Sequence, residues 1–152
     1  QPMSEQTFTL RATWTGGLDG AGHIQAGSLT TPISVPSEFG GPGIGSNPEE
    51  MLLGAAATCY IITLGALLQR TEIISLELHS RIYVQDKPTM KVNSITHCPI
   101  ITVSPQTTEE QLDKISKAAH RAEQTCMISK ALRGNVTISV EPEIRMLGAA
   151  PR

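Results

Sequence analysis

The side chains in this sequence that are best suited to covalent chemistry are its three cysteines, Cys59, Cys98 and Cys126. A thiolate is a strong nucleophile, and two thiols that meet can pass reversibly between dithiol and disulfide. Cys126 stands at the start of a predicted helix, where backbone N–H groups stabilise a thiolate, whereas Cys59 lies in an apolar stretch, where burial raises a thiol pKa. Cys98 precedes Pro99 in a predicted strand and is interpreted as a small buried apolar residue. From position alone, Cys59 and Cys126 can be either structural or reactive.

Metal and phosphate chemistry have weaker support. The histidines lack the spacing of a metal site, and His97 and Cys98 are neighbours in a predicted strand, so their side chains point to opposite faces. The glycine-rich loop 40–46 precedes a helix, as phosphate-binding loops do, but it has no P-loop lysine. Glu49 and Glu50 also occupy the helix end that would attract an anion. The sequence therefore predicts neither a metal nor a cofactor.

The element that must position Cys59 is the uncharged stretch 51–68. Asn47 is suited to cap a helix and Pro48 to its first position, so a helix is predicted to begin there. The stretch is long enough for a membrane span, but it is rich in Gly, Ala and Thr and has no flanking aromatic belt or basic cluster. We therefore expect a buried central helix. A helix that is apolar all round needs cover on every side, which a chain of 152 residues provides more easily as a dimer.

The remaining elements are predicted from alternation, helical spacing and capping residues. The expected strands span residues 7–14, 23–26, 29–35, 76–84, 89–103 and 136–140. A second helix begins at the capping box Thr107–Glu110, and a short third helix spans 126–132. The inner face of the second helix comprises Leu112, Ile115, Ala119 and Ala122. This order predicts an α+β fold with a mainly antiparallel sheet, in a single domain over residues 1–152 with flexible ends at 1–6 and 144–152.

Composition narrows the class of protein further. The chain has 12 Lys and Arg against 14 Asp and Glu, and aromatic residues make up only 3%. Without a basic excess or stacking aromatics, nucleic-acid binding is not expected. The first twenty residues show no signal-peptide pattern, so we expect a cytoplasmic protein that does not bind a membrane.

Two motifs resemble those of a known family. The first is Ser-Asn-Pro-Glu-Glu-Met-Leu at 46–52, followed by Gly-Ala-Ala-Ala-Thr-Cys at 54–59, which keeps a cysteine ten residues after the Glu of Asn-Pro-Glu. The second is Cys-Met-Ile-Ser at 126–129, where family members usually have Cys-Pro-x-Ser. Over roughly residues 7–140 the chain resembles the OsmC/Ohr proteins, which are thiol peroxidases that reduce organic hydroperoxides.

The resemblance implies a fold, a site and a set of partners. The implied fold is an intertwined homodimer with mainly antiparallel sheets packed around two long central helices. Cys59 would be the peroxidatic nucleophile that forms a sulfenic acid, and Cys126 the resolving cysteine that closes a disulfide. A dithiol, typically a dihydrolipoyl group in the family, would reopen that disulfide. No cofactor is implied.

The resemblance also gives Glu49 the role of an acid that orients the active site. Ten residues of helix separate Glu49 from Cys59, which is about 15 Å along the axis. A Glu side chain does not bridge that distance within one straight helix. We therefore expect Glu49 to act on Cys59 of the partner subunit, across the interface of a homodimer.

The chain departs from the family at the active-site arginine. One branch of the family carries Arg at the position of Leu18, and the other carries it at the position of Glu38. The residues that could replace it are Arg11, Arg70, Arg81 and Arg121. Because a neighbouring cation is a main source of thiolate at neutral pH, this departure leaves a second hypothesis open. The alternative is an OsmC-like redox sensor or apolar-ligand-binding protein with weak or no peroxidase activity.

Overall fold

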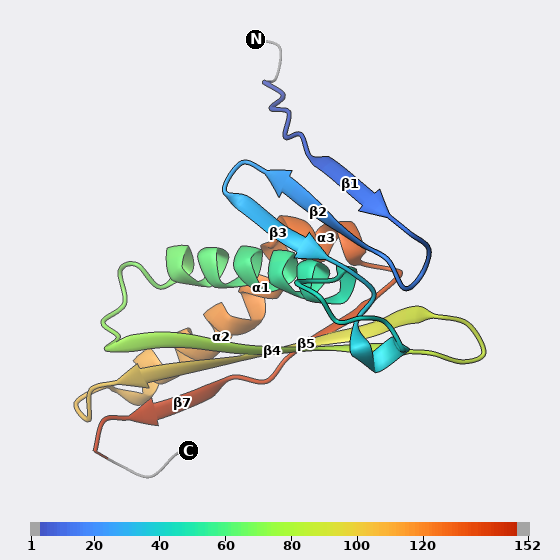
Figure 1. Ribbon diagram of the computed structural model, residues 1–152. Coiled ribbons are helices and arrows are strands. Elements are labelled where there is room, and N and C mark those ends of the chain that lie inside the picture. Colours follow the sequence, from blue (N-terminus) through green and yellow to red (C-terminus); the bar gives the residue numbers. More distant parts are fainter. Residues whose placement is uncertain (1–3, 149–152) are drawn as a thin grey trace. The chain divides into compact units, whose positions relative to one another are not determined.

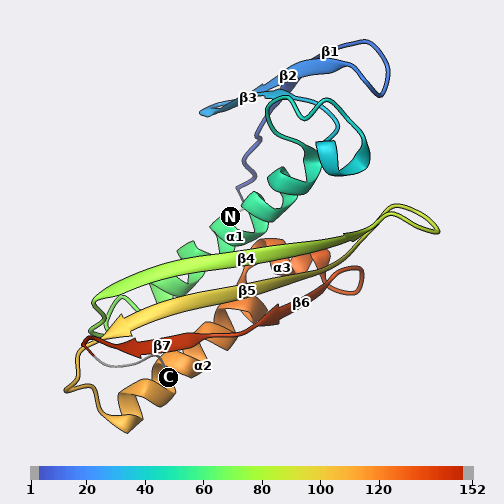
Figure 2. The same ribbon diagram turned by 60° about the horizontal axis from the view of Figure 1, so that its bottom comes forward.

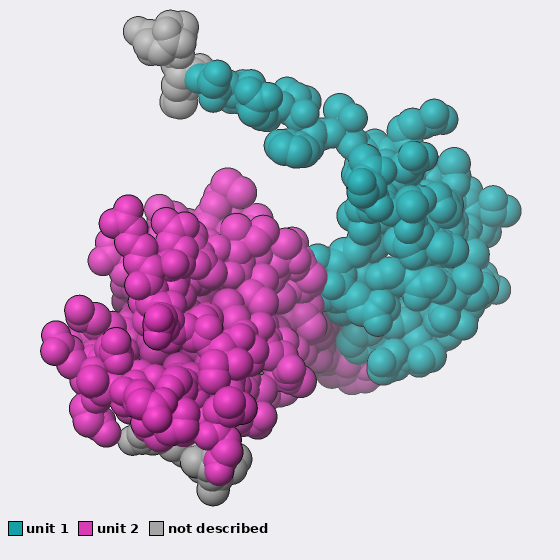
Figure 3. All heavy atoms as spheres, turned by 90° about the vertical axis from the view of Figure 1, so that its left-hand side faces the viewer, with its two compact units in different colours: residues 1–51 teal, residues 52–152 magenta. Residues whose placement is uncertain are grey.

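The computed structural model describes residues 4–148, so the predicted flexible ends fall partly outside the described residues, at 1–3 and 149–152. The chain divides into two compact units, residues 1–51 and 52–152 (Figure 3). The architecture is α+β, with three α-helices, one short 3-10 helix and two sheets among the described residues (Figure 1). The α+β class predicted from the sequence is therefore confirmed.

The first unit contains a three-stranded antiparallel meander. Its strands are β1 (Arg11–Thr15), β2 (Ala21–Ala26) and β3 (Leu29–Ile33), in the order β1-β2-β3. Gly16 has a φ of 98°, in the region that favours glycine, and opens the tight turn that joins β1 to β2. The expectation of a half-buried strand at 7–14 is wrong in two respects. β1 begins only at Arg11, and as an edge strand it exposes all five side chains.

Helix α1 (Pro48–Leu67) begins where its capping residues predict. Asn47 Oδ1 accepts a hydrogen bond from the Glu50 amide at 2.9 Å, and Pro48 occupies the first helical position. The loop before it contains the 3-10 helix η1 (Ser37–Phe39) and is tied back by Ser34, whose hydroxyl bonds both the amide and the carbonyl of Ile44. The glycine-rich loop thus shapes the entry to α1.

The single chain buries this helix on one side only, so the full cover expected for an apolar helix is not completed within one chain. Only Ala56, Tyr60 and Leu64 are buried, and they lie one helical turn apart on one line. The opposite line, Gly54, Ala55, Thr58, Ile62 and Ala66, is exposed. Among the described residues α1 alone has the length and hydropathy of a membrane-spanning helix, and core helices of soluble proteins share that property.

The second unit is built on a sheet formed by β4 (Ser75–Gln85), β5 (Lys91–Val103), β6 (Thr137–Val140) and β7 (Glu143–Met146). β4 and β5 form the predicted antiparallel hairpin, whereas β6 and β7 both pair with β5 in parallel, β6 along residues 94–97 and β7 along 100–103. A helical crossover between β5 and β6 brings the chain back in the same direction, which makes parallel pairing the natural outcome. The strand β7 is not expected from the sequence: its residues 144–146 fall in the expected flexible end, and for them that expectation is wrong.

Helices α2 (Glu109–Thr125) and α3 (Met127–Leu132) form that crossover. The capping box of α2 is Thr108 with Gln111, one residue later than predicted. Its buried residues are those expected, Leu112, Ile115, Ala119 and Ala122. Leu112, Ile115 and Ala122 form a core with Tyr60 and Leu64 of α1 and Ile101 and Val103 of β5. Figure 2 shows the three helices on one side of the sheet; the other side, on which His79 and Arg81 of β4 are exposed, is called the open face below.

Candidate active site

The structure brings two of the predicted site residues together, Cys59 and Cys126. Cys59 lies in the middle of α1 and is partly exposed, whereas Cys126 is fully buried at the junction of α2 and α3. The amide of Cys126 donates to Ala122 O at 3.0 Å to close α2, and its carbonyl accepts from the Lys130 amide at 3.0 Å to open α3. Because two helix ends fix its backbone, Cys126 holds its thiol against that of Cys59. Both cysteines are free thiols.

The surroundings of Cys59 favour its ionised form. Burial is the largest single influence and raises the pKa of the thiol, but the donors around the sulfur outweigh it and hold the pKa below its usual value. The largest of these donors are the Cys126 thiol and then the amides of Ile128 and Met127, whereas the Thr63 hydroxyl donates to the Cys59 carbonyl at 2.8 Å. The first turn of α3 thus favours the Cys59 thiolate with uncharged amide dipoles, a role that the arginine has in the family.

The surroundings of Cys126 have the opposite effect. Burial raises the pKa of the Cys126 thiol, and the hydrogen that it directs to Cys59 raises it further. The amide and hydroxyl of Ser129 and the amide of Ile128 offset this only in part. Of the two thiols, Cys59 is therefore the one that ionises more readily. This arrangement suits a nucleophile and a neighbouring proton donor.

None of the proposed substitute arginines acts on Cys59 within residues 52–148. Arg70 and Arg121 are exposed, and Arg81 lies on the open face of the sheet. No charged side chain is among the groups that shift the Cys59 pKa. Arg11 belongs to the other compact unit, where it opens β1. The two positions at which the family carries its arginine, Leu18 and Glu38, are both exposed.

Glu49, the third predicted site residue, lies in the first turn of α1. Its Oε1 is shielded from solvent and has no hydrogen-bond partner among residues 4–148. α1 is continuous from Pro48 to Leu67, so the axial separation of about 15 Å between Glu49 and Cys59 stands. The structure does not bring Glu49 to Cys59 along this helix.

Cys98 occupies a charged cluster, and the expectation that it is buried among apolar residues is wrong. Its Sγ lies 3.5 Å from Arg81 Nη1 and 3.9 Å from Glu141 Oε1. Arg81 also donates from Nε to the Tyr83 hydroxyl at 2.9 Å, and its Nη2 lies 3.6 Å from Glu141. The strand register places His79 opposite Cys98, so Cys98 faces outward. The alternation of β5 carried this signal, because His97 and Cys98 must face opposite sides.

Sequence reasoning did not identify His97 as part of the core beneath the site. Its ring is fully buried and stacks on Tyr60, the neighbour of Cys59, with ring centroids 4.5 Å apart and an interplanar angle of 15°. Nδ1 lies 2.7 Å from the Ser80 hydroxyl, and Nε2 has no partner among the described residues. Burial lowers the pKa of His97 to about 4, so the ring is neutral at pH 7. Within the described chain no cluster of His, Cys, Asp and Glu could hold a metal ion.

Comparison with known proteins places this arrangement in context. The model of the OsmC-like protein family matches residues 40–141, which include Cys59 and Cys126. The chain is 40% identical over 149 residues to the uncharacterized protein YmaD of Bacillus subtilis (strain 168), covering 96% of this chain and 99% of that protein. It is 31% identical over 137 residues to the organic hydroperoxide resistance protein OhrB of the same organism, covering 88% and 96%.

Solved structures share the fold. The crystal structure of OhrB of Bacillus subtilis matches with a TM-score of 0.64 and 26% identity, over 89% of this chain and 98% of that one. An organic hydroperoxide resistance protein OsmC from Legionella pneumophila matches with a TM-score of 0.69 and 21% identity, over 91% and 98%. The likeness extends over nearly the whole length of both chains, so both compact units have counterparts in these structures.

Proposed function

The chain belongs to the OsmC-like protein family, and from this premise we propose that it is a cysteine-based peroxidase that reduces organic hydroperoxides to alcohols. Relatives named for organic hydroperoxide resistance support a role in hydroperoxide resistance or redox chemistry. The observation that carries the proposal is that the fold brings the thiols of Cys59 and Cys126 together, with the pKa of Cys59 lowered and that of Cys126 raised. A nucleophilic thiolate with a proton-bearing thiol against it is what a two-cysteine peroxidase needs.

In the proposed cycle the Cys59 thiolate attacks the peroxide oxygen that bears hydrogen. The O–O bond breaks, Cys59 becomes a sulfenic acid, and the other oxygen leaves as an alkoxide that takes a proton from water to become an alcohol. The Cys126 thiol then attacks the sulfenic sulfur, which forms a Cys59–Cys126 disulfide and releases water. An external dithiol, such as a dihydrolipoyl group, reopens the disulfide by exchange and is itself oxidised. The cycle uses no cofactor, and we place it in the cytoplasm.

We propose that the working form is a homodimer. The exposed line on α1 consists mostly of small residues around Ile62, whose side chain is 66% exposed. Small residues let a second helix approach closely, and covering this line would complete the core that one chain leaves open. In this dimer the partner's Glu49 would orient the site around Cys59. Substituting Ile62→Glu, on an exposed position, should shift the protein from dimer to folded monomer in analytical ultracentrifugation and lower turnover.

The direct test is the consumption of cumene hydroperoxide and of hydrogen peroxide by the protein with a dithiol donor. We expect cumene hydroperoxide to be turned over faster than hydrogen peroxide. We expect Cys59→Ser to lose this turnover. Turnover that does not depend on Cys59 would contradict the mechanism.

The alternative, a redox sensor or an apolar-ligand-binding protein, is favoured by one observation, the lack of a cation among the groups that act on Cys59. The two functions differ in the reactivity of this thiol. A Cys59 pKa near that of a free thiol, about 8.5, with slow stoichiometric oxidation and no turnover, would support the alternative. A pKa below that value with multiple turnovers supports the peroxidase.

A further inference from the structure

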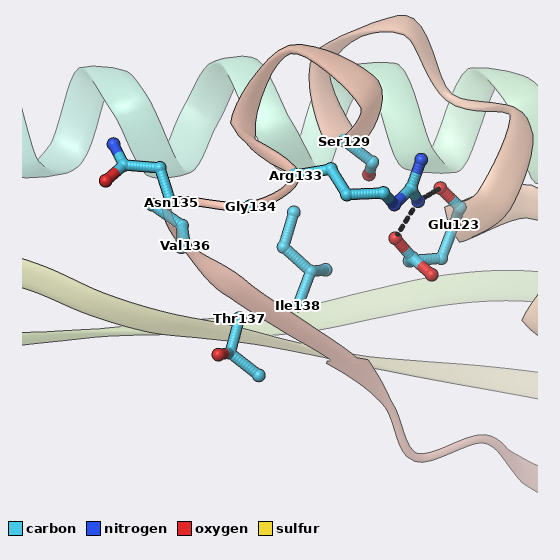
Figure 4. A pocket seen from close by; sticks show the side chains of 8 residues that line it. All are labelled: Glu123, Ser129, Arg133, Gly134, Asn135, Val136, Thr137 and Ile138. Atoms are coloured by element: carbon cyan, nitrogen blue, oxygen red, sulfur yellow. Dashed lines mark hydrogen bonds and ion pairs between the residues drawn. The ribbon is translucent and has the colours of Figure 1, made fainter.

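A cavity of about 370 Å³ lies wholly within the second unit. It is bounded by the end of α2, by α3 and by the chain that leads into β6 (Figure 4). Its lining residues are Glu123, Ser129 and the continuous run 133–138. Neither Cys59 nor Cys126 lines it, and the proposed peroxidase cycle makes no use of it.

Ser129 gives this cavity a polar group that the rest of the fold leaves unpaired. The residue is fully buried, and its Oγ has no nitrogen or oxygen partner among the described residues. Figure 4 shows this hydroxyl on the side of Ser129 that faces Arg133 and Glu123. A buried hydroxyl in a folded protein is nearly always paired, with protein, water or a ligand. The Ser129 hydroxyl is therefore placed to bind a molecule in the cavity.

Two opposite charges stand beside this hydroxyl and define the charged end of a ligand. Arg133 Nη2 lies 2.8 Å from Glu123 Oε2 and 3.5 Å from Glu123 O, with the two side chains 50% and 18% exposed. Within residues 4–148 these contacts engage only Nη2 of the guanidinium and only Oε2 of the carboxylate. The other N–H groups of Arg133 can bind a carboxylate, and Oε1 of Glu123 can accept from an ammonium group. A molecule that carries both charges therefore satisfies both side chains.

The start of β6 makes the opposite wall of the cavity apolar. Val136 is 7% exposed, and the half-buried Ile138 packs in the same hydrophobic cluster. Figure 4 shows Ile138 reaching from β6 toward Arg133, whereas Asn135 and Thr137 turn away. A ligand with its charged end on Arg133 therefore places its remaining part on an aliphatic surface.

We propose that this cavity binds a free α-amino acid with a short aliphatic side chain. The carboxylate of the ligand binds the free N–H groups of Arg133 and the Ser129 hydroxyl, and its ammonium group binds Glu123. The aliphatic side chain lies on Val136 and Ile138. The volume of about 370 Å³ is at the small end of the range for ligand sites, roughly 300–1,000 Å³, and suits a single amino acid. The proposal involves no redox step and does not depend on the peroxidase.

The experiment is titration calorimetry of the full chain, in its reduced form, with four probes. L-valine carries both charges and an aliphatic side chain, isovalerate keeps only the carboxylate, isobutylamine keeps only the ammonium group, and L-aspartate has a charged side chain. We expect L-valine to bind saturably and at least about tenfold more tightly than each of the others. Each of the others either lacks one charge-assisted contact or places a charge on the apolar wall. Amide NMR shifts on adding L-valine should centre on Ser129 and residues 133–138.

Three variants and one matched control locate the binding. Arg133→Gln and Glu123→Gln should each weaken L-valine binding by about tenfold, because each removes one charged partner. Ser129→Ala removes only the hydroxyl and should weaken it by about threefold. Arg121→Gln removes an exposed guanidinium of α2 outside the cavity and should bind L-valine as the wild type does. Thermal unfolding without ligand shows that each variant is folded.

Three results would overturn the proposal. The first is no saturable binding of L-valine up to about 10 mM. The second is a probe with one charge, or L-aspartate, that binds as tightly as L-valine. The third is L-valine binding that survives both Arg133→Gln and Glu123→Gln. None of these measurements uses peroxide, so the peroxidase proposal stands or fails separately.

Discussion

The β4–β5 sheet has a cysteine on each side, and the two cysteines have different surroundings. Charged side chains surround Cys98 on the open face, and uncharged donors surround Cys59 on the helical side. Consecutive residues of β5 turn His97 toward the helices and Cys98 toward the open face, where Arg81 and Glu141 surround it. On the helical side, Cys59 is stabilised by the Cys126 thiol and by backbone amides, without any formal charge. The side chains of Arg81 and Glu141 are 50% and 66% exposed, whereas the donors at Cys59 are fixed by the fold and partly shielded from solvent. Oriented donors can thus lower the pKa of a thiol without a formal charge and against the effect of burial.

The largest effect that would test this contrast is the loss of either sulfur. Cys59→Ser should lower peroxide turnover by about 10³-fold or more, because it removes the nucleophile. Cys98→Ser should change turnover by less than about twofold, although Arg81 lies only 3.5 Å from the sulfur. Initial rates with cumene hydroperoxide measure both. A comparable loss in Cys98→Ser would mean that the outer face takes part in the reaction.

The two faces should also differ in their response to acid, through His97 inside and His79 outside. His97 has a pKa of about 4 when folded and about 6.5 when unfolded, so below pH 6.5 the unfolded chain binds a proton that the folded one does not. Its contribution to stability is complete above pH 6.5 and is lost as the pH falls to 4. The loss is at most about 3 kcal/mol.

Urea unfolding at pH 7, 5.5 and 4.5 measures this term as the difference between the wild type and His97→Gln. His79, on the exposed face beside Glu77, supplies the matched control, because His79→Gln makes the same substitution outside the core. The same slope in all three proteins would show that burial of His97 does not set the acid response.

Local signals in the sequence predicted the elements well, and long-range pairing accounts for what they missed. Asn47 and Pro48 located the start of α1, and the inner face of α2 followed from helical spacing alone. The cap of α2 was assigned to Thr107 because Glu110 stands three residues later, but the neighbouring Thr108 with Gln111 offers the same spacing and is the one used. Residue types alone do not show which of two overlapping capping boxes begins the helix.

The site was predicted by resemblance more than by physics. Spacing left Cys59 and Cys126 open to structural or reactive roles, because 67 residues separate them and only the folded crossover through α2 and α3 brings the thiols together. The parallel pairing of β6 and β7 with β5 depends on the same crossover. The alternation of side chains along β5 predicts that Cys98 lies on the other side of the sheet from His97, so the side of this cluster could be predicted. Its contact with Glu141 could not be predicted, because no local pattern in the sequence indicates that the end of β6 lies near β4.

A smaller effect separates the two roles of Cys126, which are to donate a hydrogen to Cys59 and to close the disulfide. Cys126→Ser keeps a donor but cannot resolve the sulfenic acid, so it should slow dithiol-supported turnover by about tenfold and let dimedone trap Cys59 sulfenic acid. Cys126→Ala should slow turnover further and raise the Cys59 pKa, because the donor is lost as well. Identical Cys59 pKa values in the two variants would show that the Cys126 thiol does not help to ionise Cys59.

The smallest expected effect concerns the first turn of α3, whose amides lower the Cys59 pKa in place of an arginine. Met127 occupies the first position of α3, where the family usually has proline, and its amide is among the donors that lower the Cys59 pKa. Proline at this position leaves a helix intact but has no N–H. Met127→Pro therefore deletes one donor while keeping the fold, and Met127→Ala deletes the side chain while keeping the donor. The Met127 side chain is 70% exposed, so neither change opens a cavity.

We expect Met127→Pro to raise the Cys59 pKa by a fraction of a unit and to lower turnover at pH 7 by about threefold, with no loss of thermal stability. Met127→Ala should match the wild type in both. The pKa is measured from the pH dependence of iodoacetamide alkylation of Cys59 in a Cys98→Ser background. An unchanged pKa in Met127→Pro would show that the remaining donors suffice. A rise shared by both variants would instead assign the effect to the Met127 side chain, and the contrast between fixed dipoles and a surface cation would lose its basis at this position.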